Sequence, residues 1–508
     1  MCSSDLVVDP QSGAHTAALD DPRWKGTVDV AIDFTSPEAV VPNVTALAFG
    51  LRAWNLGVPP VYAFDEVYYA KSGCIFLGWS QERCDVTSND EQYWYRERFD
   101  VGAWVHPPLG KWAIGLGERA FGFDARDGLD RRDAFAYRVA SAVAGTLTVA
   151  ALALIVQLLF GSPLWTLAGG ALIATEGLSI VQSRVAMLDV FVGFWTTLAF
   201  LFLVLDRRWI DARTVVPDPG AFGPGEVWLP VQPVVPSPIW RPWRFACGVA
   251  IGCAAASMWS GAMAIPGIGL LSLGWECVRR RRAGQVRWFL TTVKQEGFGF
   301  VLALLVVPAF VYVASWTGWF LRFGWDLRAW ADLQASIATY HANLTLVNPD
   351  GKPWHPYLSQ ARDWFILRRP VLYFARYYGV GMRRVIYANG NPVVFWGTLL
   401  ALPTAAIAWW RRGDWRAGVA VTGILTLYVP WLLVPRPQFL FYALPVVPFM
   451  VLAMVVLLRD LVRGGYPVIA GAIVVAALGI AVLMWPTYVG LPLDSYGWEL
   501  RAWFPSWT

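Results

Sequence analysis

The chain has 508 residues, of which 56% are hydrophobic and only 15% are charged, with a formal net charge of +5 and a mean hydropathy of +0.45. A soluble protein carries about 25% charged residues, whereas here the apolar residues form repeated blocks of about 20 residues, the length that crosses a bilayer. Lys and Arg cluster in short loops between these blocks, which indicates topology and not nucleic-acid binding. Composition therefore excludes a soluble enzyme and indicates an all-α polytopic membrane protein.

The chain divides into a polar tail, a membrane domain and a second tail. Residues 1–37 are rich in Asp, Pro and Ser and are predicted to be a disordered cytoplasmic tail. The membrane domain is predicted over 38–485, with an extracytoplasmic tail at 486–508. Its eleven predicted spans lie at about 38–57, 134–160, 163–178, 187–205, 244–258, 260–275, 297–315, 392–410, 417–434, 439–458 and 466–485. The longest stretches between spans, 58–131 and 316–391, are predicted to be outer loops.

The arginine distribution predicts the orientation. With a cytoplasmic N-terminus, the longer inner loops carry arginine clusters, as the positive-inside rule requires. These clusters are Arg207-Arg208 through Arg244, Arg279–Arg282, Arg411-Arg412 with Arg416, and Arg459 with Arg463. The opposite orientation would translocate Arg279–Arg282 in a short loop. We therefore expect a multi-pass protein of the plasma membrane whose two long loops face outward.

The six cysteines form no CxxC pair and have no metal-ligand spacing with the four histidines. Cys74 and Cys84 both lie in the first outer loop, where an oxidising compartment would allow a disulfide. Spacing alone leaves open whether they pair.

The first candidate for chemistry is the acidic pair Asp65-Glu66, just after the first span. Carboxylates at a membrane boundary are costly to bury, so they tend to have a function or a partner. A solvated pair in a loop is the equally weighted alternative. Because consecutive side chains point in different directions, only one of the two should face any site.

The second candidate is the segment from His106 to Trp112, His-Pro-Pro-Leu-Gly-Lys-Trp. Its two prolines fix the backbone at the start of a predicted amphipathic helix lying on the membrane. Lys111 and His106 could face a site, or Lys111 could merely contact lipid headgroups.

Further polar residues lie at the same predicted boundary. Arg138 stands at the outer end of the second span, where anchoring a lipid phosphate is the alternative to a site role. Asp189 lies inside the apolar boundary, so a partner such as Arg184 is expected. Arg436 precedes the span at 439–458.

Taken in order, these segments resemble the protein O-mannosyltransferases in their compact bacterial form, through nearly the whole chain after residue 38. The motifs are Arg52 thirteen residues before Asp65, FDEVYYAK at 64–71, HPPLGKW at 106–112, YR at 137–138, SRVAMLD at 183–189, WSG at 259–261, HPYLS at 355–359 with Arg369-Pro370, GNP at 390–392 and FLFYALPVVPF at 439–449. Each motif alone is weak evidence, but this many motifs in the same order are specific to the family.

The resemblance implies a GT-C fold with about eleven transmembrane helices and interfacial helices in the first outer loop. It also implies transfer of mannose, with inversion, from polyprenyl-phosphate mannose to Ser/Thr hydroxyls of secreted polypeptides. Membrane lipids and the secretion translocon are the other expected partners. The outer loop at 316–391 is too short for the β-trefoil domain of eukaryotic members. Met258 also stands before Trp259-Ser260-Gly261, where the family pattern has Lys, so no cation is assigned there.

The chemistry assigns roles to these residues. A phosphate leaves as a stable anion, so one carboxylate base that takes the acceptor's proton is sufficient. By its match to the family, Asp65 is the expected base, with Glu66 orienting the acceptor or pairing with a cation. Arg138, then Lys111 and His106, are expected to bind the leaving phosphate.

Supporting and acceptor-binding roles follow less directly. We expect Arg52 to support Asp65 or Glu66, and Arg184, Asp189 and Arg436 to support the site. Acceptor contacts are expected from His355, Tyr357 and Ser359. No His/carboxylate cluster resembles a metal site, so the sequence predicts no cofactor and no metal.

Three rival functions are weighed against the protein mannosyltransferase. A GT-C transferase acting on a lipid or cell-wall glycan has the same composition and topology. A transporter would place its polar residues at the bilayer midplane, in paired broken helices. A purely structural scaffold would leave the boundary carboxylates and arginines without a reason. Clustering of polar residues at one boundary favours the transferase.

Overall fold

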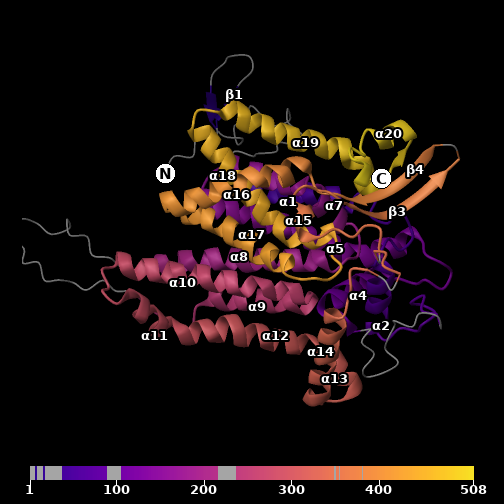
Figure 1. The fold of residues 1–508 in the computed structure, drawn as a ribbon, viewed down its shortest axis with the longest axis horizontal. Coiled ribbons are helices and arrows are strands. Elements are labelled where there is room, and N and C mark those ends of the chain that lie inside the picture. Colours follow the sequence, from indigo (N-terminus) through magenta and orange to yellow (C-terminus); the bar gives the residue numbers. More distant parts are fainter. Residues whose placement is uncertain are drawn as a thin grey trace, which may run out of the picture.

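The helices form an elongated bundle with an outer layer of loops, short helices and a small sheet at one end (Figure 1). The computed structural model describes residues 6–8, 15–17, 37–87, 104–214, 236–347, 350–353, 355–379 and 381–507. Two short strands, β1 (Leu6–Val8) and β2 (His15–Ala17), pair antiparallel within the segment that was predicted to be disordered. The other residues of that tail lie outside the described ones.

The first half of the membrane domain contains α1 (Pro37–Ala53), α2 (Glu66–Phe76), α4 (Leu109–Phe121), α5 (Arg131–Phe160), α6 (Pro163–Ala174), α7 (Gly177–Gln182), α8 (Asp189–Asp211) and α9 (Pro242–Ser257). Helix α5 begins where the sequence provides a cap. Asp130 accepts a hydrogen bond from the Asp133 amide (2.9 Å), and Asp133 accepts one from the Asp130 amide (3.1 Å). This reciprocal capping satisfies amides that the first turn leaves free.

The middle of the chain forms the 3₁₀ turn η2 (Trp259–Met263), α10 (Ala264–Arg282), α11 (Trp288–Val301), the π-helical turn η3 (Leu302–Val306), α12 (Val307–Ser315), α13 (Thr317–Phe323), α14 (Leu327–Ala342) and α15 (Ala361–Trp364). The last part forms β3 (Val371–Tyr378), β4 (Met382–Ala388), α16 (Pro392–Arg412), α17 (Trp415–Leu432), η4 (Leu440–Val446), α18 (Val447–Arg463), α19 (Pro467–Val489), β5 (Pro492–Leu493), α20 (Ser495–Glu499) and η5 (Pro505–Trp507).

All eleven predicted spans coincide with helical segments. Among the described residues, seven helices are long and apolar enough to cross a membrane, namely Arg131–Phe160, Asp189–Asp211, Trp259–Arg282, Trp288–Ser315, Pro392–Arg412, Leu440–Arg463 and Pro467–Val489. The remaining predicted spans match α1, α6 with α7, α9 and α17, which fall short in length or in apolarity. The chain is therefore a multi-pass membrane protein.

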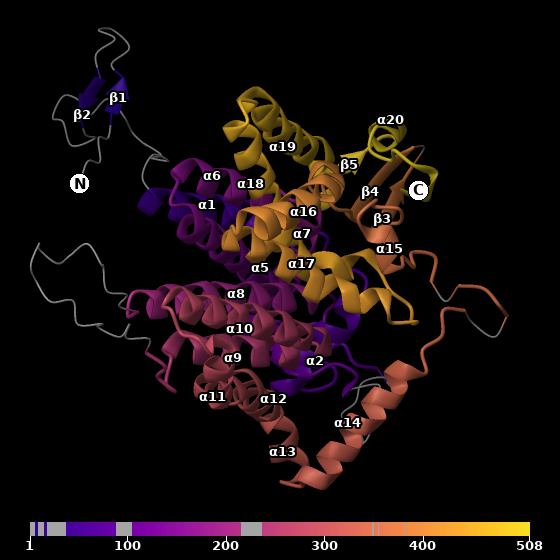
Figure 2. The same cartoon turned by 60° about the vertical axis from the view of Figure 1, so that its left-hand side comes forward.

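The outer layer contains a three-stranded antiparallel sheet in the order β3-β4-β5, which the all-α prediction missed. Its third strand belongs to the segment predicted as a C-terminal tail. That segment is anchored, since the Trp507 indole donates to the Leu367 carbonyl (2.7 Å) and Tyr387 donates to the Trp507 carbonyl (2.8 Å). Figure 2 shows this layer, with α20, at the end of the bundle where α2 and α14 also lie.

The opposite end of the bundle holds a buried group of charges from α8, the start of α9, α10 and α11, here called the buried charge cluster. Its members are Asp206, Arg241, Arg244, Glu276, Arg279, Arg280 and Glu296. Arg241 lies 2.5 Å from both Asp206 and Glu276, and Arg244 lies 2.7 Å from Glu296. The sequence identified Arg244, Arg279 and Arg280 only as topology signals.

Candidate active site

The two adjacent carboxylates of the acidic pair face different surroundings. Glu66, the first residue of α2, has no exposed surface and accepts two hydrogen bonds of 2.7 Å from Arg138. It also accepts bonds from the backbone amides of Ala63 (2.7 Å) and Ala186 (2.8 Å). Both Glu66 oxygens are therefore occupied, and only Asp65 remains to face a site, as the sequence predicted for one member of the pair.

Arg138 is buried in α5 and uses all five of its N–H donors. Besides Glu66, it donates to the carbonyls of Leu56 (3.2 Å), Pro59 (3.0 Å) and Val61 (2.9 Å). With 1% of its side chain exposed, it has no donor left for a ligand. The expectation that Arg138 binds the leaving phosphate is therefore wrong, because this arginine fixes the loop between α1 and α2.

Asp65 opens onto a cavity of about 670 Å³ at the end of the bundle that carries the sheet β3-β4-β5 (Figure 2). The cavity is lined by Asp65, Tyr68, Tyr69, Ser72, Val105, His106, Lys111, Tyr340, His341, Leu344, Thr345, His355, Arg436, Pro437, Phe439 and Tyr442. The Asp65 carboxylate makes no hydrogen bond or ion pair with any residue that the structure describes. Burial without a compensating partner raises the pKa of Asp65 to about 7.

Lys111 and His106 face the same cavity, as the motif predicted. Lys111 stands in the first turn of α4 and is 2% exposed, and this burial lowers the pKa of its ammonium to about 7. Burial also lowers the pKa of His106 well below its usual value, and the nearby charges of Lys111, His341 and Arg436 lower it further. His106 is therefore neutral at pH 7, while Lys111 responds to any anion that enters.

His341 in α14 was not singled out in the sequence, yet it orients the arginine of this cavity. Its Nε2 lies 3.1 Å from the Val105 carbonyl, and Arg436 donates to its Nδ1 at 2.7 Å. The Val105 carbonyl can only accept, so Nε2 carries the proton and Nδ1 is free to accept. The pKa of His341 is lowered by burial and by Arg436, which keeps the ring neutral. The only sequence signal was the scarcity of histidine.

Arg436 stands between the main cavity and a smaller one of about 260 Å³. The wall shared by the two consists of Val105, His106, His341 and Arg436. The rest of the smaller cavity is largely apolar and includes Met258, Trp259, Met263, Trp431 and Val434. The buried Nε of Arg436 has no hydrogen-bond partner among the described residues. A cation with spare donors thus lies where a polar chamber meets an apolar one.

The expected pairing of Arg184 with Asp189 is not formed. Arg184 donates to the carbonyls of Arg52 (2.9 Å) and Trp54 (2.7 Å) at the C-terminal end of α1, where free carbonyls attract a cation. Asp189, 5% exposed at the start of α8, lies within electrostatic range of Asp65 and Arg436 instead. Asp189 therefore supports the cavity, and Arg184 supports the chain leading to it.

Arg52 does not contact the acidic pair as expected. It donates to Ser183 (3.1 Å), Ser179 (2.9 Å) and the Ala174 carbonyl (3.2 Å), and the nearby charge that it senses is Glu176. Its role is to hold α1 against α7.

The three expected acceptor-binding residues separate. His355 lines the cavity and packs edge-on against Phe64 at 5.6 Å. Tyr357 is half-buried and not part of the cavity lining. Ser359 is 2% exposed, and its backbone amide donates to the Gln438 carbonyl at 2.9 Å, so it holds the loop against the segment before η4. Of this motif, the structure brings only His355 to the site.

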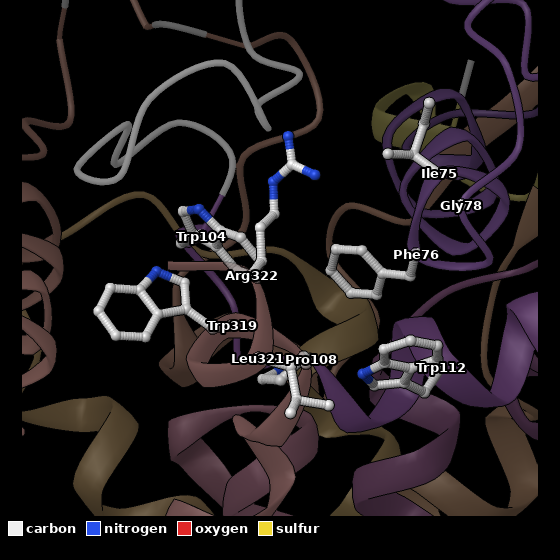
Figure 3. A pocket seen from close by; sticks show the side chains of 10 residues that line it. Ile75, Phe76, Gly78, Trp104, Pro108, Trp112, Trp319, Leu321 and Arg322 are labelled. Carbon is white, nitrogen blue, oxygen red and sulfur yellow. The ribbon is translucent and has the colours of Figure 1, made fainter. Parts of the chain in front are cut away.

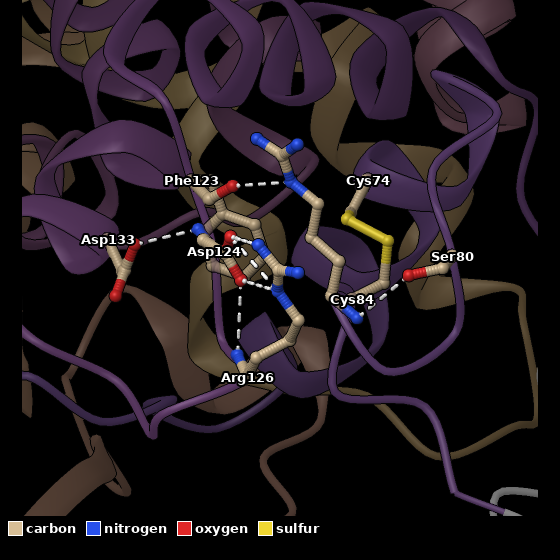
Figure 4. The surroundings of a disulfide bond; sticks show 8 residues. Cys74, Ser80, Cys84, Phe123, Asp124, Arg126 and Asp133 are labelled. Atoms are coloured by element: carbon tan, nitrogen blue, oxygen red, sulfur yellow. Dashed lines mark hydrogen bonds and ion pairs between the residues drawn. A yellow bond between two sulfur atoms is a disulfide. The ribbon is translucent and has the colours of Figure 1, made fainter.

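A disulfide between Cys74 and Cys84 ties the last turn of α2 to the loop that follows it (Figure 4). In the same loop, Arg83 donates to the Phe123 carbonyl at 2.9 Å, just after α4. The pairing left open by the sequence is thus present, and the loop that it fixes to α2 reaches the end of α4 through Arg83.

A separate aromatic pocket of about 470 Å³ lies between α2, α4 and α13. In Figure 3 the rings of Trp104 and Trp319 lie to one side and those of Phe76 and Trp112 to the other, with the Arg322 side chain between them. Phe76 packs on Trp104 at 5.5 Å and on Trp112 at 5.2 Å. This packing braces the far side of α2 and α4. Within the described ranges, no three His, Cys, Asp or Glu side chains are grouped to hold a metal ion.

Comparison with known proteins places this arrangement in a family. The family model for dolichyl-phosphate-mannose-protein mannosyltransferase matches residues 84–209, and the model for the C-terminal four-transmembrane region of protein-O-mannosyltransferase matches residues 326–507. A polyprenol-phosphate-mannose–protein mannosyltransferase of Mycobacterium tuberculosis is 30% identical, over 91% of this chain and 90% of the relative.

The chain belongs to the protein O-mannosyltransferase family. Another member, from Corynebacterium glutamicum, is 28% identical over 80% of this chain and 82% of its own length. The fold agrees, since the chain matches the Saccharomyces cerevisiae Pmt1-Pmt2 complex bound to the sugar donor with a TM-score of 0.72 and 13% identity, over 100% of this chain and 97% of that one. This protein O-mannosyltransferase is therefore a membrane glycosyltransferase, as the motifs predicted.

Proposed function

We propose that this enzyme transfers mannose from polyprenyl-phosphate mannose to Ser or Thr hydroxyls of secreted polypeptides. The observation that carries the mechanism is the division of the acidic pair. Glu66 is fully occupied by Arg138 and two backbone amides, whereas Asp65 faces the cavity without a partner among the described residues. The names of the relatives support the donor and the acceptor class.

Asp65 acts as the general base. The acceptor hydroxyl loses its proton to the Asp65 carboxylate as its oxygen attacks the anomeric carbon of mannose. The bond between that carbon and the phosphate oxygen breaks on the opposite face, which inverts the configuration and releases polyprenyl phosphate. A base with a pKa of about 7 suits this step at neutral pH.

Arg436 and Lys111 bind the leaving phosphate in place of Arg138. A polyprenyl phosphate has a charged head on an apolar chain, and Arg436 stands where the polar cavity meets the apolar one. Neutral His341 orients its guanidinium, and Lys111 supplies a second cation once the anion raises its pKa.

The acceptor peptide enters from the outer rim of the cavity. Tyr68 and Tyr340 are exposed there, and His355 stands on the neighbouring wall. Coupling to the secretion translocon would present acceptors while they are still unfolded. We further propose that no metal ion is required, since two cations of the chain can neutralise the departing phosphate.

The proposed site faces outward across the plasma membrane, with the N-terminus in the cytoplasm and eleven spans of GT-C type. The helix ends and loops at the end of the bundle away from the cavity carry the clusters Arg207-Arg208, Arg279–Arg282, Arg411-Arg412 and Arg459 with Arg463, as a cytoplasmic end requires. The Cys74–Cys84 disulfide at the cavity end fits an oxidising compartment.

The test is transfer in purified membranes from radiolabelled polyprenyl-phosphate mannose to a Ser/Thr/Pro-rich peptide, with and without a chelator. Label in the peptide with wild type, retained in chelator and lost in Asp65→Asn, is the expected result. Label that partitions only with lipid would replace the protein acceptor by a lipid or glycan one. Equal peptide labelling by Asp65→Asn would reject Asp65 as the base.

A further inference from the structure

A groove of about 790 Å³ lies on the membrane-embedded side of the bundle, between α10 and α17. The two helices run side by side (Figure 2) and are antiparallel, because Gly267 packs against Thr426 near one end while Trp275 contacts Trp415 near the other. The apolar residues along it are Pro266, Leu270, Leu271, Val278, Leu425 and Val429. Leu270 is 70% exposed, so side chains of the described residues leave it largely uncovered.

Glycine makes the groove wide in its middle and closed at one end. A Cβ on Gly267 would lie 2.6 Å from Thr426, so the helices touch there. A Cβ on Gly274 would meet no atom within 4 Å, so the groove is open beside it. From Pro266 to Arg282 the α10 face extends about 24 Å at 1.5 Å per residue, longer than the roughly 15 Å of one hydrocarbon leaflet.

The open end of the groove is cationic and aromatic. Arg207 of α8 and Arg282 of α10 line it, and none of the described lining residues is acidic. The Arg207 guanidinium lies 3.9 Å from the Trp415 ring and 4.7 Å from the Trp275 ring, which hold it in place. Arg207 lies 3.4 Å from Asp211, and its buried Nε has no hydrogen bond among the described residues.

These features fit one kind of amphiphile. An apolar channel of leaflet length takes an acyl chain, while two arginines at its end take a phosphate. Tryptophan rings favour the depth at which lipid headgroups lie, and basic pockets between transmembrane helices on the cytoplasmic side bind anionic headgroups.

We propose that this groove binds one anionic phospholipid of the cytoplasmic leaflet, with its phosphate between Arg207 and Arg282 and an acyl chain along Gly274 and Leu270. The site lies at the opposite end of the bundle from Asp65 and takes no part in mannose transfer. Of the proposed function, it uses only the orientation of the chain.

The experiment titrates the purified full-length protein with phosphatidylglycerol or with phosphatidylcholine of the same acyl chains and counts bound lipids by native mass spectrometry. We expect one phosphatidylglycerol to bind at least about tenfold more tightly than phosphatidylcholine. The double variant Arg207→Gln/Arg282→Gln should weaken phosphatidylglycerol about 10- to 30-fold, as the loss of two juxtamembrane charges predicts. The matched control Arg281→Gln/Arg411→Gln removes two arginines near the same end that do not line the groove, and should change affinity less than about twofold.

Two further measurements keep the result independent of folding. Gly274→Leu places a side chain in the groove from a Cβ that meets no atom within 4 Å, so it should weaken phosphatidylglycerol binding while leaving the unfolding temperature in detergent unchanged. A photo-crosslinking amino acid in place of Leu270 should attach phosphatidylglycerol in otherwise wild-type protein.

Several outcomes would overturn the proposal. Equal affinity for the two lipids would contradict a specific site. So would an equal loss of phosphatidylglycerol affinity in Arg281→Gln/Arg411→Gln, because general charge attraction would then explain the binding. Displacement of phosphatidylglycerol by equimolar polyprenyl phosphate would assign the groove to the carrier lipid. Crosslinking of Leu270 to a second copy of the chain would make it a protein interface.

Discussion

Every member of the buried charge cluster at one end of the bundle lies within 4 Å of opposite charge, whereas Asp65 at the other end has no such partner among the described residues. Both groups are buried, and burial of charge is costly in either place. The cluster recovers that cost by pairing, but Asp65 does not, which leaves the pKa of Asp65 near 7. Charge that is buried and left unneutralised is characteristic of a working site.

The strongest way to test this contrast is Asp65→Asn. Loss of the base should lower transfer about 10²- to 10⁴-fold. The same substitution should increase the stability of the folded protein at pH 8. The folded pKa of Asp65 lies above its unfolded value, so its ionisation destabilises the folded state increasingly as pH rises from about 4 to 7. The variant should therefore unfold at a higher temperature than wild type at pH 8, measured by calorimetry in detergent. A lower unfolding temperature at pH 8 would contradict the unpaired burial of Asp65.

Glu276→Gln should have the opposite effects to Asp65→Asn, with lower stability and unchanged transfer. Glu276 contacts Arg241, Arg279 and Arg280, so its neutralisation leaves buried arginines uncompensated and should cost about 3–5 kcal/mol. Transfer per folded molecule should remain at the wild-type value. Chemical denaturation and a transfer assay on the same preparation measure both, and a loss of turnover without a loss of stability would connect the cluster to catalysis.

Glu66→Gln separates the two neighbours of the acidic pair. The new amide would present N–H groups to Arg138 and to backbone amides, so we expect a loss of about 3 kcal/mol in stability. Asp65→Asn is the matched control, since it makes the same chemical change one residue away. Equal stability of the two variants would show that Arg138 finds another partner.

Lys111→Arg should have the smallest effect on transfer, and it tests whether transfer requires a protonated Lys111. Transfer requires Asp65 deprotonated, above about pH 7, and Lys111 protonated, below about pH 7, so kcat/KM should follow a narrow bell centred near pH 7. Arginine stays charged, so the alkaline limb should move up by at least about one pH unit. The measurement is the pH dependence of kcat/KM for both proteins. If the alkaline limb of the variant is unchanged, deprotonation of Lys111 is not what lowers kcat/KM at high pH.

The sequence was informative where the signal is local. Apolar runs located the helices, and Asp130 with Asp133 marks the start of α5. The partners of charges could not be read in this way. Arg138 and Glu66 are 72 residues apart in the sequence. An arginine can bind either a phosphate or a carboxylate, and the sequence does not distinguish the two partners. His341 was missed because its value depends on Arg436, 95 residues away. Strand β5 of the sheet β3-β4-β5 was missed because it contributes only two residues.

The helices α2 and α4 meet backbone to backbone, which limits how the enzyme can be redesigned. A Cβ on Gly73 would lie 2.8 Å from the Gly115 nitrogen, and one on Gly115 would lie 2.6 Å from the Gly73 carbonyl oxygen. No side chain can be added at either position without separating the helices that hold Asp65 and Lys111. Efforts to broaden the range of acceptors should therefore leave this seam intact and vary the rim, where Tyr68 and Tyr340 are exposed.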